Sequence, residues 1–384
     1  MVAAVRRGQS LHQVAGRFRV SPATVLRWVR RARGQRLDRV DWSDRPHAPR
    51  HTRRTTAGLE DLILGVRRQL REQSDLGFYG AAAIRDELAR RHIAPLPSAR
   101  TVNRVLERRG AFDGRRRVRR PAPPPGWYWP DLAARRVELD SFDIVEGLVI
   151  KGGPDVEVLT GVSLHGGLPT AWPWDASVTA PFVVERLVEH WRQFGLPAYA
   201  QFDNDTTFHG SHAHPGIVGR VSRLCLSLKV VPVFVPPRET GFQAAAEAFN
   251  GSWQARVWAR FRHHDLAELR GRSQRHVAAL RGHRAARIEA APPRRPFPRR
   301  WELDLQAPLR GRLVYLRRTD AAGRVDVLGQ TFAVDRRWVN RLVRVEVDLG
   351  AGRLRVYRLR RRQPRDQPLL AAIRYRWVDR QFHE

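Results

Sequence analysis

The sequence predicts a multidomain protein in which all-α modules precede an α/β core, and a small all-β domain follows the core. Three patterns indicate this order: helical periodicity in residues 10–109, strands alternating with helices in residues 136–260, and valines at every second position in residues 343–347. Two proline-rich segments, residues 114–125 and 291–300, separate these patterns and are expected to be linkers.

Charge supports this division and indicates an anionic partner. The 384-residue chain carries 70 basic and 38 acidic residues, a formal net charge of +32, and all but two of the basic residues are arginine. Residues 1–125 carry 29 basic and 11 acidic groups and residues 260–384 carry 31 and 13, whereas residues 126–259 carry 10 and 14. A uniform bias toward arginine would not leave the middle acidic. Because arginine binds phosphate in a planar, bidentate way, we expect two arms that hold nucleic acid around an acidic core.

Composition excludes several classes of protein. With 42% hydrophobic residues and 12 tryptophans, the chain has enough apolar surface to bury cores, so a collagen-like or wholly disordered chain is excluded. The single Cys225 excludes a disulfide framework and a multi-cysteine zinc module. No apolar run approaches the ~20 residues of a membrane helix, and the N-terminal residues lack a signal-peptide core. We expect a cytoplasmic, nucleoid-associated protein with no membrane partner.

Residues 10–33 have the pattern of a helix-turn-helix. Apolar residues recur on one helical face from Leu11 to Phe18, after which Ser21 and Pro22 supply an N-cap and a first helical residue. Four polar residues of the second helix are free to face outward: Thr24, Arg27, Arg30 and Arg31. We expect this helix to read base edges in the major groove of DNA. The alternative is an ordinary helical hairpin with a solvated arginine face.

A second helical module is expected over residues 58–109. Its last helix has Ser98 as its N-cap and buries Val102, Val105 and Leu106. Two small DNA-binding modules in tandem are the simplest interpretation.

Residues 136–260 alternate between strands and helices. Three strand-like segments come first, followed by a helix near 179–194, a strand at 198–202, a strand at 230–235 and a helix at about 243–260. This order predicts a mixed five-stranded sheet flanked by helices. Beyond residue 301, strands at 312–318 and 324–328 and the alternating valines predict a small antiparallel barrel or sandwich of about five strands.

Three carboxylates in the acidic core occupy positions that a metal-dependent site requires. Asp140 lies within the first strand, Asp203 follows the strand at 198–202, and Glu247 lies in the first turns of a helix. Individually, such residues are more often turn formers, helix caps or solvated charges. Together they supply hard oxygen ligands from rigid elements, which suits two Mg²⁺ or Mn²⁺ ions ~4 Å apart that clamp the attacking and leaving oxygens of a phosphodiester.

These residues resemble the acidic-triad (DDE) transposases of bacterial insertion sequences, which share a ribonuclease-H-like core with retroviral integrases. Leu139-Asp140 resembles the family's mid-strand aspartate, and the run Asp-Asn-Asp-Thr-Thr-Phe at 203–208 resembles its Asp-Asn-Gly-x-x-Phe motif. Gln243 and Glu247, with Asn250 three residues later, resemble its Gln-Gly-x-x-Glu motif. The resemblance spans nearly the whole chain, helix-turn-helix arms and terminal barrel included.

The resemblance implies a DNA transposase or integrase, a polynucleotidyl transferase that binds the terminal repeats of a mobile element, cleaves at their ends and joins them to target DNA. Asp140, Asp203 and Glu247 would hold two Mg²⁺ (or Mn²⁺) ions, and a homo-oligomer of at least two chains is implied because two DNA ends must meet. The expected domains are a helix-turn-helix domain (1–50), a second helical DNA-binding module (51–113), a basic proline-rich linker (114–130), a ribonuclease-H-like catalytic core (131–265), a helical and proline-rich linker (266–300) and a small DNA-binding β-barrel (301–384).

Some assignments have alternatives. Asp143 competes with Asp140 for the first ligand position, because side chains three apart on a strand point to opposite faces and only one of the two can serve. Asn250 and Gln254, one and two turns beyond Glu247, are expected to contact substrate DNA. A cluster of histidines in one loop is an alternative zinc-ligand set, although we expect solvated side chains there: His209, His212 and His214.

Two other functions remain open at this point. One is a catalytically inert DNA-binding regulator derived from a transposase, and the other is a metal-dependent nuclease without strand transfer. An assay that supplies a pre-cut end and a target duplex separates a nuclease from a transposase, because only a transposase yields joined product.

Overall fold

The computed structural model describes residues 1–44, 55–112, 125–210, 218–237, 239, 241–361, 363–375 and 382. The chain divides into two compact units, Met1–Thr56 and Ala57–Glu384. Residues 114–124 of the expected first linker, together with His212 and His214, lie outside the described residues. None of the helices in the described ranges is both long and apolar enough to cross a membrane.

The first unit is a small cluster of helices. It contains α1 (Val2–Arg6), α2 (Leu11–Phe18), α3 (Pro22–Arg31) and the short 3₁₀ helix η1 (Leu37–Arg39). Ser10 and Ser21 cap α2 and α3 by accepting hydrogen bonds from the amides of Gln13 and Thr24, and Pro22 occupies the first turn of α3. The two helices and the break between them are as predicted.

The second unit begins with three helices, α4 (Ala57–Gln73), α5 (Ala81–Arg90) and α6 (Ala99–Arg108). Apolar residues at helical spacing form their common core: Ile63, Val66, Ile84, Leu88, Val102, Val105 and Leu106. The chain after α4 is tied to the rest of the unit, because Arg260 Nη1 donates to the carbonyl of Ser74 (2.6 Å) and His276 Nδ1 lies 2.8 Å from the carbonyl oxygen of Asp75.

A nine-stranded mixed sheet forms the centre of the second unit, in the order β11-β10-β9-β6-β5-β4-β1-β2-β3. Its strands are β1 (Leu139–Val149), β2 (Asp155–Ser163), β3 (Pro169–Trp174), β4 (Tyr199–Phe202), β5 (Val231–Phe234), β6 (Arg312–Arg318), β9 (Leu342–Asp348), β10 (Arg353–Arg358) and β11 (Leu369–Arg374). Neighbouring strands are parallel from β1 through β4 and β5 to β6, and antiparallel elsewhere. The strands β1 to β5 are the predicted mixed five-stranded sheet.

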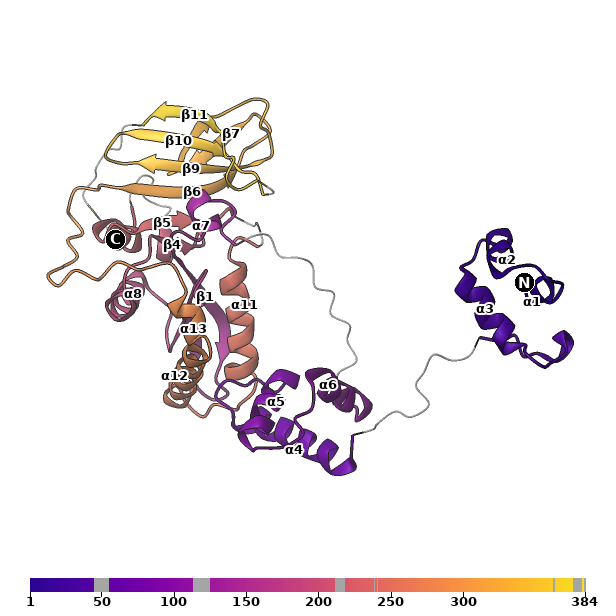
Figure 1. Cartoon of the computed structure of the whole chain (residues 1–384). Coiled ribbons are helices and arrows are strands. Elements are labelled where there is room, and N and C mark those ends of the chain that lie inside the picture. The colour runs from indigo at the N-terminus through magenta and orange to yellow at the C-terminus, as the bar shows by residue number, and fades with distance from the viewer. Residues whose placement is uncertain are drawn as a thin grey trace. The chain divides into compact units, whose positions relative to one another are not determined.

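Helices cover both faces of β1, with α8 (Ala180–Phe194) on one side and α11 (Ala244–Trp253) on the other (Figure 1). The α8 face also holds α10 (Arg220–Ser227), and the α11 face holds the π-helical turn η2 (Gln254–Trp258) and α12 (Leu266–His283). The remaining short helices are α7 (Pro130–Ala133), α9 (Thr206–His209) and α13 (Ala285–Glu289). Residues 266–283 were expected in a linker; instead α12 buries Leu269, Val277 and Leu280 in the core, because these residues form one apolar stripe.

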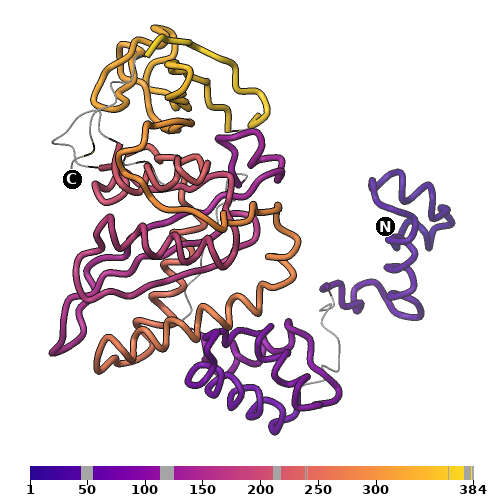
Figure 2. Tube along the Cα trace, turned by 90° about the vertical axis from the view of Figure 1, so that its left-hand side faces the viewer, coloured from indigo at the N-terminus to yellow at the C-terminus, as the bar shows by residue number. Residues whose placement is uncertain are grey.

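The C-terminal strands differ in one respect from the expected small antiparallel barrel or sandwich, because they join the core sheet. The predicted strands form, but β6 pairs in parallel with β5 through Val233↔Val314 and Phe234↔Tyr315, so β6, β9, β10 and β11 extend the core sheet. Only β7 (Arg324–Val327) and β8 (Gln330–Ala333) form a second, two-stranded sheet. In Figure 2 the orange part of the chain, which includes β6, lies next to the core, and the yellow C-terminal part lies beyond it. The reason is physical: an uncovered β5 would leave a row of unpaired backbone groups at its edge, and β6 satisfies part of that row.

Candidate active site at the ends of two parallel strands

Asp143 and Asp203 lie level on adjacent parallel strands. β1 pairs with β4 in the register Asp140↔Ala200 and Ser141↔Gln201. Two residues further along that register, Asp143 comes beside Asp203, which directly follows β4. Since alternate residues of a strand share a face, Asp143 is on the side of β1 that also carries Val145 and packs against α11.

The carboxyl group of Asp143 is half-buried among like charges. Burial, and then the carboxylates of Asp203 and Glu247, raise the pKa of Asp143 from 3.8 to about 6. Asn250 Nδ2 donates a 2.7 Å hydrogen bond to Asp143 Oδ2, and Asn250 Oδ1 accepts one of 2.7 Å from Thr160 Oγ1. The carboxamide of Asn250 is held at both ends, so it fixes the orientation of Asp143. A carboxyl with such a raised pKa in a cluster of acids is typical of functional sites.

Asp203 opens a tight turn between β4 and α9. Its Oδ1 accepts a 3.0 Å hydrogen bond from the amide of Asp205, and Asp205 in turn accepts one of 2.8 Å from the amide of Thr207 and so caps α9. Burial and the nearby carboxylates of Asp205 and Glu146 raise the pKa of Asp203. Asp205 therefore stabilises the turn, as aspartate commonly does.

Glu247 approaches the same place from α11. Gln243, the N-cap residue of α11, donates from Nε2 to the carbonyl of Phe142 at 3.1 Å, which fastens the start of the helix to β1 beside Asp143. The side chain of Glu247 is exposed and accepts a long 3.4 Å hydrogen bond from the amide of Gly241. Asn250, expected to contact DNA, is instead 8% exposed and hydrogen-bonded to Asp143. It lies one helical turn beyond Glu247, so both residues are near the same end of β1.

Asp140, expected as the first ligand, does not lie with the other carboxylates, because its side chain points to the opposite face of β1 from Asp143. There it is 1% exposed, accepts a 3.1 Å hydrogen bond from Trp191 Nε1 and forms a bidentate ion pair with Arg294. Burial opposes ionisation, yet the Arg294 guanidinium, helped by His190, holds the pKa of Asp140 well below its usual range. A carboxylate neutralised in this way holds the fold together and has no free oxygen directed at a substrate.

The strand starts and the register, which only the structure gives, explain why Asp143 and not Asp140 lies beside Asp203. Parallel neighbours that begin level bring equal offsets side by side, and Asp203 lies four residues after the start of β4 at Tyr199, as Asp143 does after the start of β1 at Leu139. No sequence pattern pointed to Thr160 or Arg294, whose contacts span 90 and 154 residues.

As the side chains stand, no three His, Cys, Asp or Glu residues within the described ranges are grouped closely enough to hold a metal ion. Asp143 is turned to Asn250 and Glu247 to Gly241, as expected for like charges that repel one another. The donor chemistry nevertheless fits a hard divalent cation, because all three groups are carboxylates and their mutual repulsion is what a cation would relieve.

The residues expected to contact DNA in the first unit lie on α3. Arg27 and Arg30 are exposed, as predicted. Arg31 is engaged within the unit, where it pairs with Asp41 at 3.2 Å, and the hydroxyl of Thr24 lies 2.9 Å from that of Ser21. In the second unit, Gln254 is half-buried at the start of η2. His209, the described member of the histidine cluster, ends α9 and packs edge-on against the ring of Phe234.

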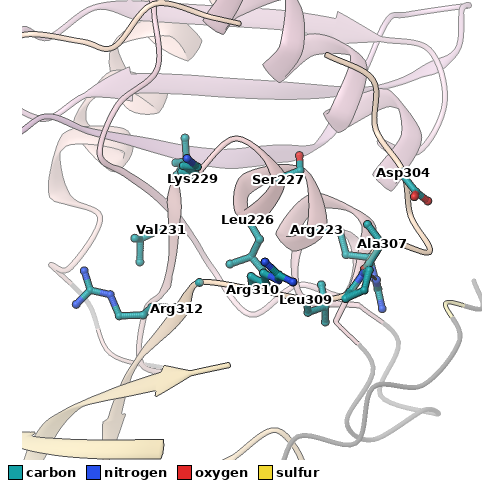
Figure 3. Close-up of a pocket in the computed structure, with 13 residues that line it drawn as sticks. Arg223, Leu226, Ser227, Lys229, Val231, Asp304, Ala307, Leu309, Arg310 and Arg312 are labelled. Carbon is teal, nitrogen blue, oxygen red and sulfur yellow. Dashed lines mark hydrogen bonds between the residues drawn. The ribbon is translucent and has the colours of Figure 1, made fainter. Parts of the chain in front are cut away.

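A cavity of about 540 Å³ lies away from these carboxylates (Figure 3). Residues of α10, the start of β5 and segment 304–312 surround it, and its cationic residues are Arg223, Lys229, Arg310 and Arg312. Two of these are engaged inside the protein, since Arg223 donates to the carbonyl of Leu305 at 2.8 Å and Arg312 pairs with Glu346 at 3.4 Å. The cavity borders the starts of β5 and β6, whereas Asp203 follows the end of β4, so it is not part of the carboxylate cluster.

No protein-family model matches the chain, and no curated protein matches it. Among solved structures, the chain is similar to the catalytic core domain of BIV integrase, with 16% identity, coverage of 37% of this chain and 82% of that chain, and a TM-score of 0.26. A simian T-cell lymphotropic virus intasome in complex with PP2A regulatory subunit B56 gamma matches with 12% identity over 71% of this chain and 91% of that chain, with a TM-score of 0.34.

The HTLV-2 integrase catalytic core domain in complex with magnesium matches with 12% identity over 29% of this chain and 64% of that chain, with a TM-score of 0.23. These similarities are low both in identity and in superposition. We therefore infer function from the placement of the carboxylates.

Proposed function

We propose that this chain is a DDE-type polynucleotidyl transferase that acts on DNA, with Asp143, Asp203 and Glu247 as its acidic triad. One observation carries the proposal: Asp143 and Asp203 come level at the ends of two adjacent parallel strands, and Glu247 lies on the helix that packs over the same face. Three carboxylates on one face of an α/β core are the ligands that a metal-dependent phosphodiester-cleaving site requires, and raised pKa values in two of them are typical of functional sites.

The cofactors of the proposed site are divalent cations, two Mg²⁺ or Mn²⁺ ions held by Asp143, Asp203 and Glu247. When bound, such ions activate the attacking water or 3′-hydroxyl and stabilise the leaving oxygen. Asn250 holds the carboxylate of Asp143 in place through the 2.7 Å hydrogen bond from its Nδ2 to Oδ2. With a pKa of about 6, Asp143 is mostly ionised at neutral pH and so is ready to bind a cation.

The proposed substrates are the terminal repeats of a mobile element and a target duplex, bound by an oligomer of at least two chains. The exposed Arg27 and Arg30 on α3 support contacts with DNA in the first unit. In the second unit part of the arginine excess is used internally, because Arg281 Nε and Arg284 Nη1 donate to the carbonyls of Pro169 (3.1 Å) and Gly167 (2.7 Å). Net charge alone therefore overstates the surface that is free for phosphate.

A strand-transfer assay tests the proposal. A pre-cut duplex end, a labelled target duplex and Mg²⁺ or Mn²⁺ are incubated with the full chain and with Asp203→Asn. The matched control is Asp155→Asn, an exposed carboxylate at the start of β2. Joined product from the wild type and from Asp155→Asn, but not from Asp203→Asn, supports the proposal.

Two results would overturn it in different directions. Cleaved DNA without joined product identifies a metal-dependent nuclease. Tight DNA binding that is unchanged in Asp203→Asn, with neither cleavage nor joining by the wild type, identifies an inert DNA-binding regulator.

A further inference from the structure

Arg317 in β6 is a half-buried cation at the boundary between the C-terminal strands and the core. Burial lowers the pKa of Arg317 to about 10, so it stays charged at neutral pH. Its guanidinium lies over the ring of Tyr315, 4.9 Å from the centroid, and Tyr315 stacks on Phe234 of β5. The aromatic stack therefore determines where the guanidinium points.

The guanidinium of Arg317 is directed at the turn that carries Asp203. Arg317 Nη2 donates a 2.8 Å hydrogen bond to Asn204 Oδ1, and its Nη1 donates one of 3.1 Å to the carbonyl of Val235. Asn204 Nδ2 donates to that same carbonyl at 2.6 Å. Both ends of the Asn204 side chain are thus held, one by β6 and one by the residue after β5.

Asn204 directly follows Asp203. The hydrogen bonds that hold the Asn204 side chain therefore also restrain the backbone of Asp203, the proposed ligand. Asp203 is otherwise restrained by the 3.0 Å hydrogen bond that it accepts from Asp205, and that bond lies within the turn itself. Through its side chain, Asn204 links the residue after Asp203 to β6 and to the residue after β5 by hydrogen bonds. Without Arg317, Asn204 would keep its hydrogen bond to the Val235 carbonyl but lose its link to β6.

We propose that Arg317 is a positioning residue for the acidic site: through Asn204 it sets Asp203 against Asp143, so the C-terminal strands complete the metal-binding centre. This inference rests on the proposed function. Residues that orient a metal ligand without touching the metal typically change metal affinity or activity by roughly 10–100-fold when removed. Lysine is a poor substitute, because one ammonium group does not reproduce a planar fork that bridges two acceptors.

The test measures Mn²⁺ binding by isothermal titration calorimetry on the full chain, alongside strand transfer and thermal unfolding. The variants are Arg317→Ala, Arg317→Lys, Asn204→Ala and the double variant Arg317→Ala/Asn204→Ala. Arg353→Ala, an exposed arginine of β10, is the matched control. Asp203→Asn is measured in the same series.

We expect Mn²⁺ binding to weaken roughly 10–100-fold in Arg317→Ala, with partial recovery in Arg317→Lys and no change in Arg353→Ala. Asn204→Ala should match Arg317→Ala, and the double variant should be no worse than either, because both residues act through one contact. If Arg317→Ala does not fold, Asn204→Ala and Arg317→Lys decide the question.

Wild-type Mn²⁺ affinity in folded Arg317→Ala or in Asn204→Ala would overturn the inference, as would additive losses in the double variant. A different result would contradict the proposed function itself. In that case Asp203→Asn would bind Mn²⁺ with the same affinity as the wild type, independently of the result for the Arg317 variants.

Discussion

The two faces of β1 each carry an aspartate, and the electrostatic surroundings of the two aspartates are opposite. On the α8 face, Asp140 is paired with Arg294 and its pKa is held well below the usual range. On the α11 face, Asp143 lies near Asp203 and Glu247, and its pKa is raised to about 6. They lie three positions apart on one strand, yet one carboxylate is neutralised by an arginine and the other is surrounded by like charges.

This difference shows that burial by itself does not mark a site. A buried carboxylate with a bidentate arginine contributes to the stability of the fold, and removing either partner leaves an uncompensated charge. A cluster of carboxylates without a cationic partner costs stability, and that cost is tolerated where a cation or substrate can relieve it. The comparison can be tested from both sides.

The largest expected effect is on activity, from Asp143→Asn. Loss of a metal ligand removes several kcal/mol of transition-state stabilisation, so strand transfer should fall by roughly 10³-fold or more. The free energy of unfolding should stay the same or rise, because repulsion with Asp203 and Glu247 is relieved. The strand-transfer assay and urea denaturation are carried out on the same preparations. Retained strand transfer in a folded variant would contradict the assignment of Asp143 as a metal ligand.

The next effect is on stability, from Asp140→Asn. Because Arg294 would be left buried without its partner, we expect a loss of ~3–5 kcal/mol in the free energy of unfolding. Combining it with Arg294→Met should recover much of that loss, since both charges are then absent. A stable Asp140→Asn protein without strand-transfer activity would contradict a structural role for this residue.

The two aspartates should also respond oppositely to pH. Asp143 binds its proton more tightly when folded, so it makes stability fall as pH rises from about 4 to about 6, by about 2 kcal/mol at most given its partial exposure. Asp140 binds its proton less tightly when folded, so its contribution is present above about pH 4 and is lost at lower pH.

Urea denaturation from pH 3 to 8, on the wild type and on Asp143→Asn, measures this difference. The decline between about pH 4 and 6 should be reduced in the variant. An unchanged pH profile would mean that Asp143 is not the titrating group.

The smallest expected effect comes from Asn250→Ala. This change removes the donor to Asp143, so the pKa of Asp143 should rise further and Mn²⁺ binding should weaken roughly tenfold near neutral pH. Gln193→Ala, an exposed amide on α8, is the control. If metal binding by Asn250→Ala weakened equally at every pH, Asn250 would act through shape and not through the charge of Asp143.

Local features were well predicted. The caps at Ser21 and Ser98 and the strand at 312–318 appear where the sequence places them, because hydroxyl caps and residue periodicity act over a few positions. Long-range pairing was not predictable in this way. The parallel contact of β6 with β5 joins residues about eighty positions apart, and no local pattern in either strand specifies its neighbour.

The sequence by itself determined which residue types were available: an acidic core between basic arms, two aspartates of which only one can face the site, and a glutamate on a following helix. Tertiary structure alone decided which aspartate that is. Arg294 reaches Asp140 across 154 residues and holds its pKa low, whereas burial and the distant carboxylates of Asp203 and Glu247 raise the pKa of Asp143.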